Sequence, residues 1–251
     1  MGLDTDITKL PKGFSRDHKG VIAFNKEIIH ATQDYAVAYK LNTAFYEQLG
    51  GNGWKAIEKT KEIIPQTIFS IADAKRGDIG NTSMMYAKAF FETMDFDAVT
   101  VAPYMGLDSV EPFLKFDNKH TIVLGLTSNL GSENFQTNPL YQPPLYKTVL
   151  STIKNWGTVE NLMFVIGATK ANALEEIRQI VPDHFLLIPG VGAQGGDANA
   201  VCKFGKNAHG GLLINSSRGI IYASSDKNFA EAARQKASEL ALITKPHTNH
   251  L

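Results

Sequence analysis

The chain has 251 residues, of which 43% are hydrophobic and 20% are charged, and its 25 lysines and arginines balance its 25 aspartates and glutamates. This length suits one large α/β barrel or two small domains, with enough residues to bury a substantial core. The formal net charge of zero excludes a global electrostatic field as the means of attracting nucleic acid or a membrane surface, so an anionic ligand would have to be held by local groups.

Short, β-branched, apolar segments recur along the chain, and several of them are apolar almost throughout. This pattern is typical of strands that are buried on both faces of a parallel sheet. The predicted strands are Val37–Asn42, Thr67–Lys75, Ala98–Pro103, His120–Ser128, Leu162–Thr169, His184–Val191 and Gly211–Arg218.

Segments with helical periodicity separate these strands. We expect helices at Phe24–Tyr35, Thr43–Glu62, Thr82–Thr93 and Ala171–Ile180, and a last helix over Asn228–Ile243. Strands that alternate with helices through right-handed crossovers leave two main architectures, an open doubly wound sheet and a closed barrel.

A closed barrel needs an eighth strand. The segment Met1-Gly-Leu-Asp-Thr-Asp6 resembles the end of a strand that enters a polar loop, so we expect the chain to begin inside its first strand. The predicted fold class is then an α/β protein, a (β/α)8 TIM barrel with a short first strand, and residues 1–251 form one domain. The connection over residues 129–161 is long, with a helix expected near Thr148–Trp156, and it can be either a lid or passive packing.

Asp73 and Lys75 close an apolar strand, and Asp78 lies just beyond it. Asp73 and Lys75 are two residues apart, so they share one face of an extended strand, and Asp78 follows in the loop. At the carboxyl end of a barrel strand, that face points into the mouth, where barrel active sites lie. A solvated cluster of salt bridges is the alternative, but unpaired charge next to a buried strand would be costly. We therefore favour a functional site.

Lys40 lies near the end of a second strand that reads as buried, Tyr35-Ala-Val-Ala-Tyr-Lys-Leu-Asn42. An isolated lysine there would be unstable, so it needs an anionic partner. Asp73 is the natural candidate because the ends of neighbouring barrel strands lie close together. Lys40, Asp73, Lys75 and Asp78 are therefore predicted to form a network of alternating charge.

A glycine-rich segment, Leu187-Ile-Pro-Gly-Val-Gly-Ala-Gln-Gly-Gly-Asp197, follows the seventh strand of the expected barrel. Glycines let backbone N–H groups approach an anion, and the N-terminus of the next helix favours negative charge. Phosphate in such barrels commonly binds after strands 7 and 8. Arg218 ends the next strand and can donate two hydrogen bonds to phosphate. These features predict a phosphate site.

The chain has one cysteine, Cys202, which cannot form an internal disulfide and is expected to pack in the core. No apolar run approaches the ~20 residues that span a bilayer. The N-terminus has no basic region followed by an apolar one, so it does not resemble a signal peptide. No histidine or cysteine spacing is typical of a zinc site. We expect a cytoplasmic protein without a bound metal.

Together these segments resemble the orotidine 5'-phosphate decarboxylase family, in its bacterial branch with longer loops (type 2). The Asp-x-Lys-x-x-Asp pattern of that family is present as Asp73, Lys75 and Asp78. The further matching segments, in family order, are Gly2–Asp6, Ala38–Asn42, Leu126–Ser132, Pro189–Asp197 and Asn215–Gly219. The resemblance runs from residue 2 to about residue 240 and is far more specific than any one motif. The family normally has a helix and a full strand before Gly2.

The resemblance implies a lyase of pyrimidine (UMP) biosynthesis that converts orotidine 5'-phosphate to UMP and CO2 with no metal or cofactor. Lys75 would protonate C6 of the pyrimidine, and Asp73 would face the carboxylate of the substrate. Asp4 and Lys40 would hold ribose hydroxyls. The other implied contacts are Ser128 with the base, Gln194 and Arg218 with the phosphate, and Pro189, Gly192 and Gly195 in the loop that binds the substrate. Asp78 and Thr82 would reach the site of a neighbouring subunit in a homodimer.

Two alternatives stay open from the sequence. The sugar-phosphate branch of the same barrels, which includes hexulose-phosphate synthase, shares the Asp-x-Lys-x-x-Asp pattern. Its members resemble magnesium enzymes, with an acidic residue where this chain has Lys40. A barrel that binds nucleotide phosphate without catalysis is the other alternative, although the four charged residues of the predicted network are all present.

Overall fold

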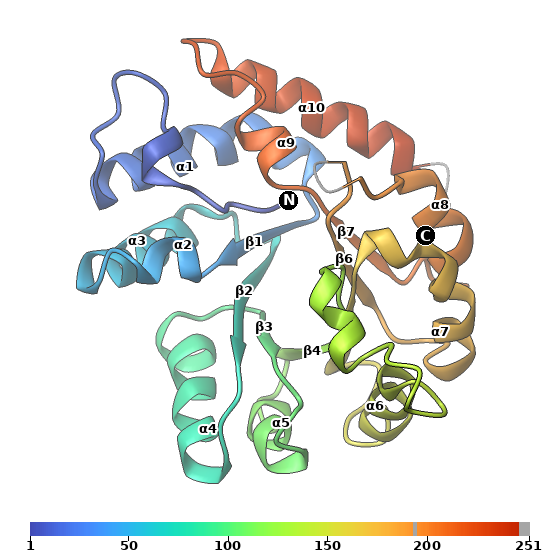
Figure 1. The fold of residues 1–251 in the computed structure, drawn as a ribbon. Helices are drawn as coiled ribbons and strands as arrows, with labels where there is room; N and C mark the ends of the chain where they lie inside the picture. Colours follow the sequence, from blue (N-terminus) through green and yellow to red (C-terminus); the bar gives the residue numbers. More distant parts are fainter. Residues whose placement is uncertain (193–194, 246–251) are drawn as a thin grey trace. The chain divides into compact units, whose positions relative to one another are not determined.

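The computed structural model describes residues 1–192 and 195–245, and the chain divides into two compact units. Unit 1 consists of residues 1–74 and 216–243, and unit 2 consists mainly of residues 75–215. The seven predicted strands are all confirmed, and they follow one another in chain order in a parallel sheet (Figure 1). A doubly wound sheet would reverse its order at a switch point, so the observed order is that of a barrel.

Unit 1 contains β1 (Ala38–Asn42) and most of β2 (Phe69–Arg76), which pair in parallel with Asn42 opposite Asp73. Its helices are α1 (His18–Thr32), α2 (Ala44–Glu47), α3 (Gly51–Ile63), α9 (Arg218–Ile221) and α10 (Phe229–Thr244).

The residues Met1–Leu3 take the place of the eighth strand within unit 1. The N–H of Lys40 donates to the carbonyl of Met1, and the N–H of Leu3 donates to the carbonyl of Lys40, each at 2.8 Å. On the other side, the N–H of Gly2 donates to the carbonyl of Ser216 at 2.8 Å. This short extended segment therefore pairs with β1 and with the chain that follows the last strand, and no full strand precedes β1 in the described part of the chain.

Two helices of unit 1 differ from the prediction. Helix α1 begins six residues early, at His18 rather than Phe24, because the carboxylate of Asp17 caps it by accepting the N–H groups of Lys19 and Gly20. The helix predicted over Thr43–Glu62 is two helices, α2 and α3. The chain breaks between them at Gly50, which adopts φ 61°, a conformation that glycine permits without steric cost.

Unit 2 contains the strands β3 (Ala98–Val101), β4 (His120–Leu126), β5 (Leu162–Ile166), β6 (Leu186–Pro189) and β7 (Leu212–Asn215). Its helices are α4 (Gly80–Lys88), which continues as a π-helical turn over Ala89–Thr93, α5 (Leu107–Leu114), α6 (Leu145–Ile153), α7 (Leu174–Ile180) and α8 (Ala198–Gly205). Helix α5 had no counterpart among the predicted helices, whereas α8 is the helix expected to follow the glycine-rich segment. Helix α6 begins three residues before the predicted Thr148.

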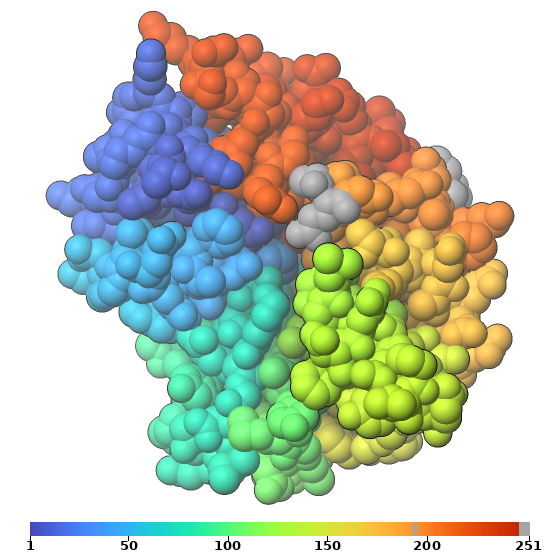
Figure 2. Space-filling view, viewed as in Figure 1, coloured from blue at the N-terminus to red at the C-terminus, as the bar shows by residue number. Residues whose placement is uncertain are grey.

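The long connection after β4 carries a 3-10 helix over Leu130–Asn134 before α6, and it lies at the surface (Figure 2). Cys202 is 2% exposed in α8, which confirms the packed thiol. Within the described residues, no helix combines the length and the apolar character that crossing a membrane requires.

Candidate functional site

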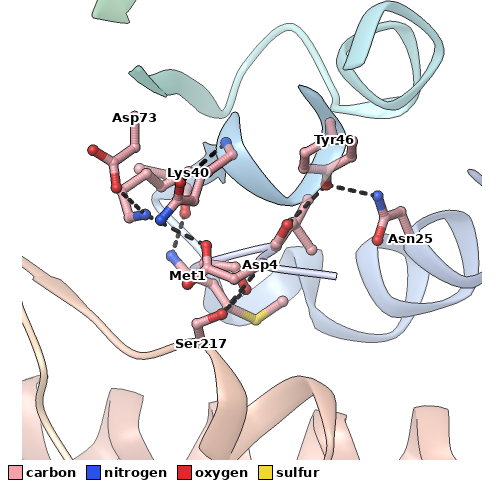
Figure 3. Close-up of polar contacts among 12 residues, drawn as sticks. Met1, Asp4, Asn25, Lys40, Tyr46, Asp73 and Ser217 are labelled. Carbon is pink, nitrogen blue, oxygen red and sulfur yellow. Dashed lines mark hydrogen bonds and ion pairs between the residues drawn. The ribbon is translucent and has the colours of Figure 1, made fainter. Parts of the chain in front are cut away.

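Lys40 forms a buried ion pair with Asp73 in unit 1, as the sequence predicted (Figure 3). The Nζ of Lys40 lies 2.8 Å from Oδ2 of Asp73, and the two residues are only 3% and 9% exposed. Burial by itself would lower the pKa of Lys40, but the carboxylates of Asp73 and Asp4 outweigh it, so the pKa lies above its ordinary value. The amine is therefore a fixed positive charge in the described structure.

Asp4 is the second acidic neighbour of Lys40. Its Oδ1 lies 3.5 Å from the Nζ of Lys40, which is longer than the bond to Asp73. This distance is a favourable charge contact without the geometry of a hydrogen bond, and the buried Oδ1 of Asp4 has no hydrogen-bond partner within the described residues. Asp4 thus keeps the capacity to accept a hydrogen bond beside a cation.

The amino group of Met1 lies in the same cluster, which the sequence did not predict (Figure 3). It donates to the carbonyl of Ala38. Burial, followed by repulsion from Lys40, lowers the pKa of this amine from 8.0 to about 5. Lys40 carries the positive charge of the cluster.

Lys75 follows Asp73 in β2 but adopts φ 47°, which is unusual for a residue with a side chain. Its N–H donates to Oγ1 of Thr100 on β3 at 2.9 Å, which holds the backbone in this conformation. The expectation that Lys75 shares a face with Asp73 assumed extended backbone, so alternation alone does not place this side chain. Lys75 is exposed within the single chain. Backbone strain of this kind is often found at functional sites.

Asp78 and Thr82 lie on one segment of unit 2, at the start of α4. The carboxylate of Asp78 accepts the N–H of Ile79 at 2.8 Å, and the N–H of Thr82 donates to the carbonyl of Ile79 at 3.1 Å. Thr82 is exposed and Asp78 is half-buried. Both side chains are accessible from outside the chain.

The glycine-rich segment of unit 2 folds on itself. Gly190, Gly192 and Gly195 adopt φ values of 94°, 78° and 83°. The N–H of Gly192 donates to the carbonyl of Gly196. The N–H of Gly195 donates to the carbonyl of Gly192, and the N–H of Gly196 donates to the carbonyl of Gly190. These three donors shape the loop instead of remaining available for an anion. Gln194 lies outside the described residues.

Ser128 and Pro189 lie at the carboxyl ends of two strands of unit 2, although β4 ends at Leu126 and not at Ser128 as predicted. Ser128 follows β4, and a Cβ at Gly167 would come within 2.7 Å of its backbone nitrogen, so glycine is required for this close approach. Pro189 ends β6 opposite Asn215 of β7. The buried Oδ1 of Asn215, which the sequence did not single out, has no hydrogen-bond partner within residues 1–192 and 195–245.

Arg218 begins α9 in unit 1 and is exposed. The preceding Ser217 joins this helix to the segment that carries Asp4, because its hydroxyl accepts the N–H of Asp4 at 3.3 Å and donates to the carbonyl of Gly2 at 3.1 Å. Tyr222, just after α9, accepts the N–H of Asp6 at 2.7 Å. Unit 1 thus brings Asp4, Lys40 and Asp73 together and ties the start of α9 to Asp4.

Comparisons with known proteins identify the family of the chain. Residues 17–234 match the model of the orotidine 5'-phosphate decarboxylase / HUMPS family. The orotidine 5'-phosphate decarboxylase of Christiangramia forsetii is 59% identical over 243 residues, which cover 96% of this chain and 89% of that protein.

Solved structures share the fold. The orotidine 5'-monophosphate (OMP) decarboxylase of Leishmania donovani superposes with a TM-score of 0.83 at 34% identity, covering 96% of this chain and 92% of that one. The UMP synthase of Leishmania donovani superposes with a TM-score of 0.85 at 35% identity, covering 96% of this chain, which spans about half (52%) of that longer protein. The chain therefore belongs to the orotidine 5'-phosphate decarboxylase / HUMPS family.

Proposed function

We propose that the chain decarboxylates orotidine 5'-phosphate to UMP and CO2, a step of pyrimidine biosynthesis, without a metal or cofactor. The observation that carries this proposal is the buried Lys40, paired with Asp73 at 2.8 Å and with Asp4 at 3.5 Å. The name of the relative that is 59% identical supports the same reaction.

Lys40 also distinguishes the two branches that the family name combines, the orotidine 5'-phosphate decarboxylases and the sugar-phosphate enzymes. In the sugar-phosphate branch, the position of Lys40 is expected to be acidic and to help hold magnesium. Here a lysine amine occupies the space between two carboxylates and neutralises them in part. A divalent cation placed among Asp4, Lys40 and Asp73 would be repelled by the ammonium group. The geometry of unit 1 therefore favours the decarboxylase.

The reaction requires a stabilised carbanion. When the bond between C6 and the carboxylate breaks, the electron pair stays in an sp2 orbital of C6, where the ring does not delocalise it. A preorganised positive charge next to C6 is the remaining means of stabilisation. We assign this role to Lys75, whose ammonium group then transfers its proton to C6 and is reprotonated from solvent. Asp73, next to the substrate carboxylate, would raise the energy of the ground state, a contribution whose weight is debated in general.

The rest of the substrate would be held away from C6. We assign the ribose hydroxyls to Asp4 and Lys40, the base to Ser128, and the phosphate to Arg218 with the loop that carries Pro189, Gly192, Gln194 and Gly195. Binding energy from the phosphate can position the base for reaction. Arg218 suits this role because its exposed guanidinium offers two parallel donors to phosphate oxygens.

We further propose that the active unit is a homodimer, in which Asp78 and Thr82 complete the site of the partner. The support is a group of exposed apolar side chains on α4 and on the turn before α5, two elements that pack together in unit 2. This group, which we call the α4–α5 patch, consists of Ile79, Met85, Tyr86, Tyr104, Met105 and Leu107. Large exposed apolar patches mark interaction surfaces, and a two-fold dimer buries the same patch on both subunits.

A single domain over residues 1–251 and a cytoplasmic location remain predictions. The location is consistent with the single cysteine, because proteins of the reducing cytosol rarely depend on disulfides.

The test is a direct assay. The purified chain is mixed with orotidine 5'-phosphate in the presence of EDTA, and the loss of the conjugated carboxyl group is followed by ultraviolet absorbance. Turnover that is unaffected by EDTA supports the proposal and contradicts both the magnesium branch and a silent binding protein. A folded chain that does not convert the substrate contradicts the proposal.

A further inference from the structure

A buried polar network lies beside Asp4 in unit 1 (Figure 3). Its members are Thr5, Asn25 on α1, Tyr46 on α2 and Thr60 on α3, and all four have an exposed fraction of 0%. The hydroxyl of Thr5 donates to Oδ1 of Asn25 at 2.6 Å, and Nδ2 of Asn25 donates to the hydroxyls of Tyr46 at 2.9 Å and Thr60 at 3.0 Å. The hydroxyl of Tyr46 donates to the carbonyl of Leu3 at 2.8 Å. The network is therefore connected from Leu3 to Thr5.

The hydrogen bonds of this network are made to Leu3 and Thr5, the two residues that flank Asp4. Tyr46 holds the carbonyl that precedes Asp4, and Asn25 holds the side chain that follows it. The backbone of Asp4 is held from the opposite side, because its N–H donates to Ser217 and its carbonyl accepts from Tyr222. The chain on both sides of Asp4 is thus held by partners from α1, α2 and the two ends of α9.

Packing alone does not explain these residues. Phenylalanine at position 46 and apolar residues at positions 25 and 60 would fill a core of the same size, but they would leave the carbonyl of Leu3 and the hydroxyl of Thr5 without these partners. Buried polar groups are costly unless every member is hydrogen-bonded, so such a network is kept where it fixes one arrangement. What it fixes here is the segment Leu3–Thr5, and the carboxylate that the segment carries lies 3.5 Å from Lys40 with a buried, unsatisfied Oδ1.

We propose that Tyr46 and Asn25 are positioning residues for recognition of the substrate's ribose. They hold Asp4 so that its Oδ1, which lies 3.5 Å from the ammonium group of Lys40, accepts a hydrogen bond from a ribose hydroxyl. This inference rests on the proposed function, in which the ribose lies against Asp4 and Lys40. A hydroxyl donor is the group that an unsatisfied carboxylate oxygen next to an ammonium group would accept from.

The test is Tyr46→Phe, which removes one hydroxyl and keeps the ring. The matched control is Tyr39→Phe, because Tyr39 is also 0% exposed but its hydroxyl contacts Thr32 and the carbonyl of Ile29 on α1 instead of the Asp4 segment. The kcat/KM of each variant is measured with orotidine 5'-phosphate and with its 2'-deoxy and 3'-deoxy analogues. Stability is followed in parallel by the Tm.

We expect Tyr46→Phe to lower kcat/KM for orotidine 5'-phosphate by about tenfold, the effect of one misplaced hydrogen bond at a buried acceptor. The loss should be much smaller for the analogue that lacks the hydroxyl bound by Asp4, and it should largely disappear in the Asp4→Ala background. Tyr39→Phe should affect all three substrates equally. If the role of Tyr46 is merely structural, Tyr46→Phe will lower its Tm and change kcat/KM equally for all three substrates. That outcome would overturn the inference.

A second pair of variants keeps the test decisive if Tyr46→Phe does not fold. Thr5→Ser retains the hydroxyl that donates to Asn25, whereas Thr5→Val removes it with little change of shape. Discrimination between orotidine 5'-phosphate and the deoxy analogue should persist in Thr5→Ser and fall in Thr5→Val. Equal discrimination in both would contradict the inference. An inactive wild-type chain would instead contradict the proposed function, so the two failures are distinguishable.

Discussion

The ammonium nitrogen of Lys40 lies 2.8 Å from Oδ2 of Asp73, and this pair joins neighbouring parallel strands with almost no exposure to solvent. Two charges removed from water are stable together only when they meet each other and further polar groups. Asp4 supplies the additional negative charge for Lys40. The contacts of the chain itself therefore hold these charges in place, which is the condition for electrostatic preorganisation.

Removal of Asp73 should destabilise the chain strongly. In Asp73→Ala, Lys40 keeps only Asp4 at 3.5 Å, so we expect the free energy of unfolding to fall by about 3–5 kcal/mol, as measured by urea denaturation. The control is Glu62→Ala, which breaks the exposed pair with Lys59 at 2.7 Å and should leave the free energy of unfolding nearly unchanged. Similar losses of unfolding free energy in both variants would show that burial does not increase the contribution of the Lys40–Asp73 pair to stability.

Two substitutions of Lys75 distinguish the role of its side chain in turnover from the effect of its backbone conformation on stability. Both Lys75→Ala and Lys75→Gly should abolish turnover while UMP binding, measured by calorimetry, stays detectable. Because residue 75 adopts φ 47°, the glycine variant should be the more stable of the two by about 1 kcal/mol. Substantial turnover in either variant would refute the role of Lys75 as the acid. If the alanine variant is at least as stable as the glycine variant, the backbone at residue 75 is not strained.

Substitution of Arg218 should weaken catalysis although the residue touches no reacting atom. We expect Arg218→Ala to lower kcat/KM for orotidine 5'-phosphate by roughly a hundredfold, on the scale of a lost charge-assisted contact. Orotidine, which lacks the phosphate, should react equally slowly with the wild type and the variant. A comparable loss with orotidine would mean that Arg218 does not act through the phosphate.

Mixing two inactive variants tests whether Asp78 acts across a dimer. If Asp78 completes the partner's site, a Lys75→Ala subunit paired with an Asp78→Ala subunit has one site with both defects and one intact site. Random exchange should then restore about a quarter of the wild-type activity, because half of the dimers are mixed. The mixture should stay inactive if Asp78 serves its own chain. Tyr104→Asp in the α4–α5 patch should prevent the recovery, and the oligomeric state is checked by light scattering.

His184 should make the chain less stable in mild acid. The residue is 8% exposed, its ring lies 5.4 Å from that of Phe164, and neither ring nitrogen has a hydrogen-bond partner in the described part of the chain. Burial lowers its pKa, with Asp183 and Glu160 opposing and Arg178 and Lys154 reinforcing the shift. The unfolded state then binds more protons than the folded state as the pH falls below about 6.5, so stability is lost in that range.

The measurement is the free energy of unfolding at pH 7.5 and at lower pH for the wild type and for His184→Phe. The variant should lose less stability on acidification, although His120, whose pKa is also lowered by burial, will retain part of the effect. Parallel curves for the two proteins would contradict the assignment.

Much of the fold followed from local pattern. Each of the seven predicted strands is present because a run of β-branched, apolar residues is suited to a strand covered on both faces. The Lys40–Asp73 pair could also be predicted, since a buried lysine requires an anion and Asp73 lies on the adjacent strand. The predicted start of α1 at Phe24 was wrong although the sequence carries the capping residue, Asp17, directly before the true start at His18.

The sequence by itself determined which segments are strands, which family motif they carry, and that Lys40 needs an acidic partner, because these features depend on neighbouring residues and on the cost of burying charge. Only the tertiary structure decided the positive φ at Lys75, the hydrogen bonds that the glycine loop makes to itself, and the network that connects Thr5, Asn25, Tyr46 and Thr60. The members of that network are distant in sequence and individually ordinary, so no periodicity marks them. Their roles arise only when packing brings α1, α2 and α3 against the segment that carries Asp4.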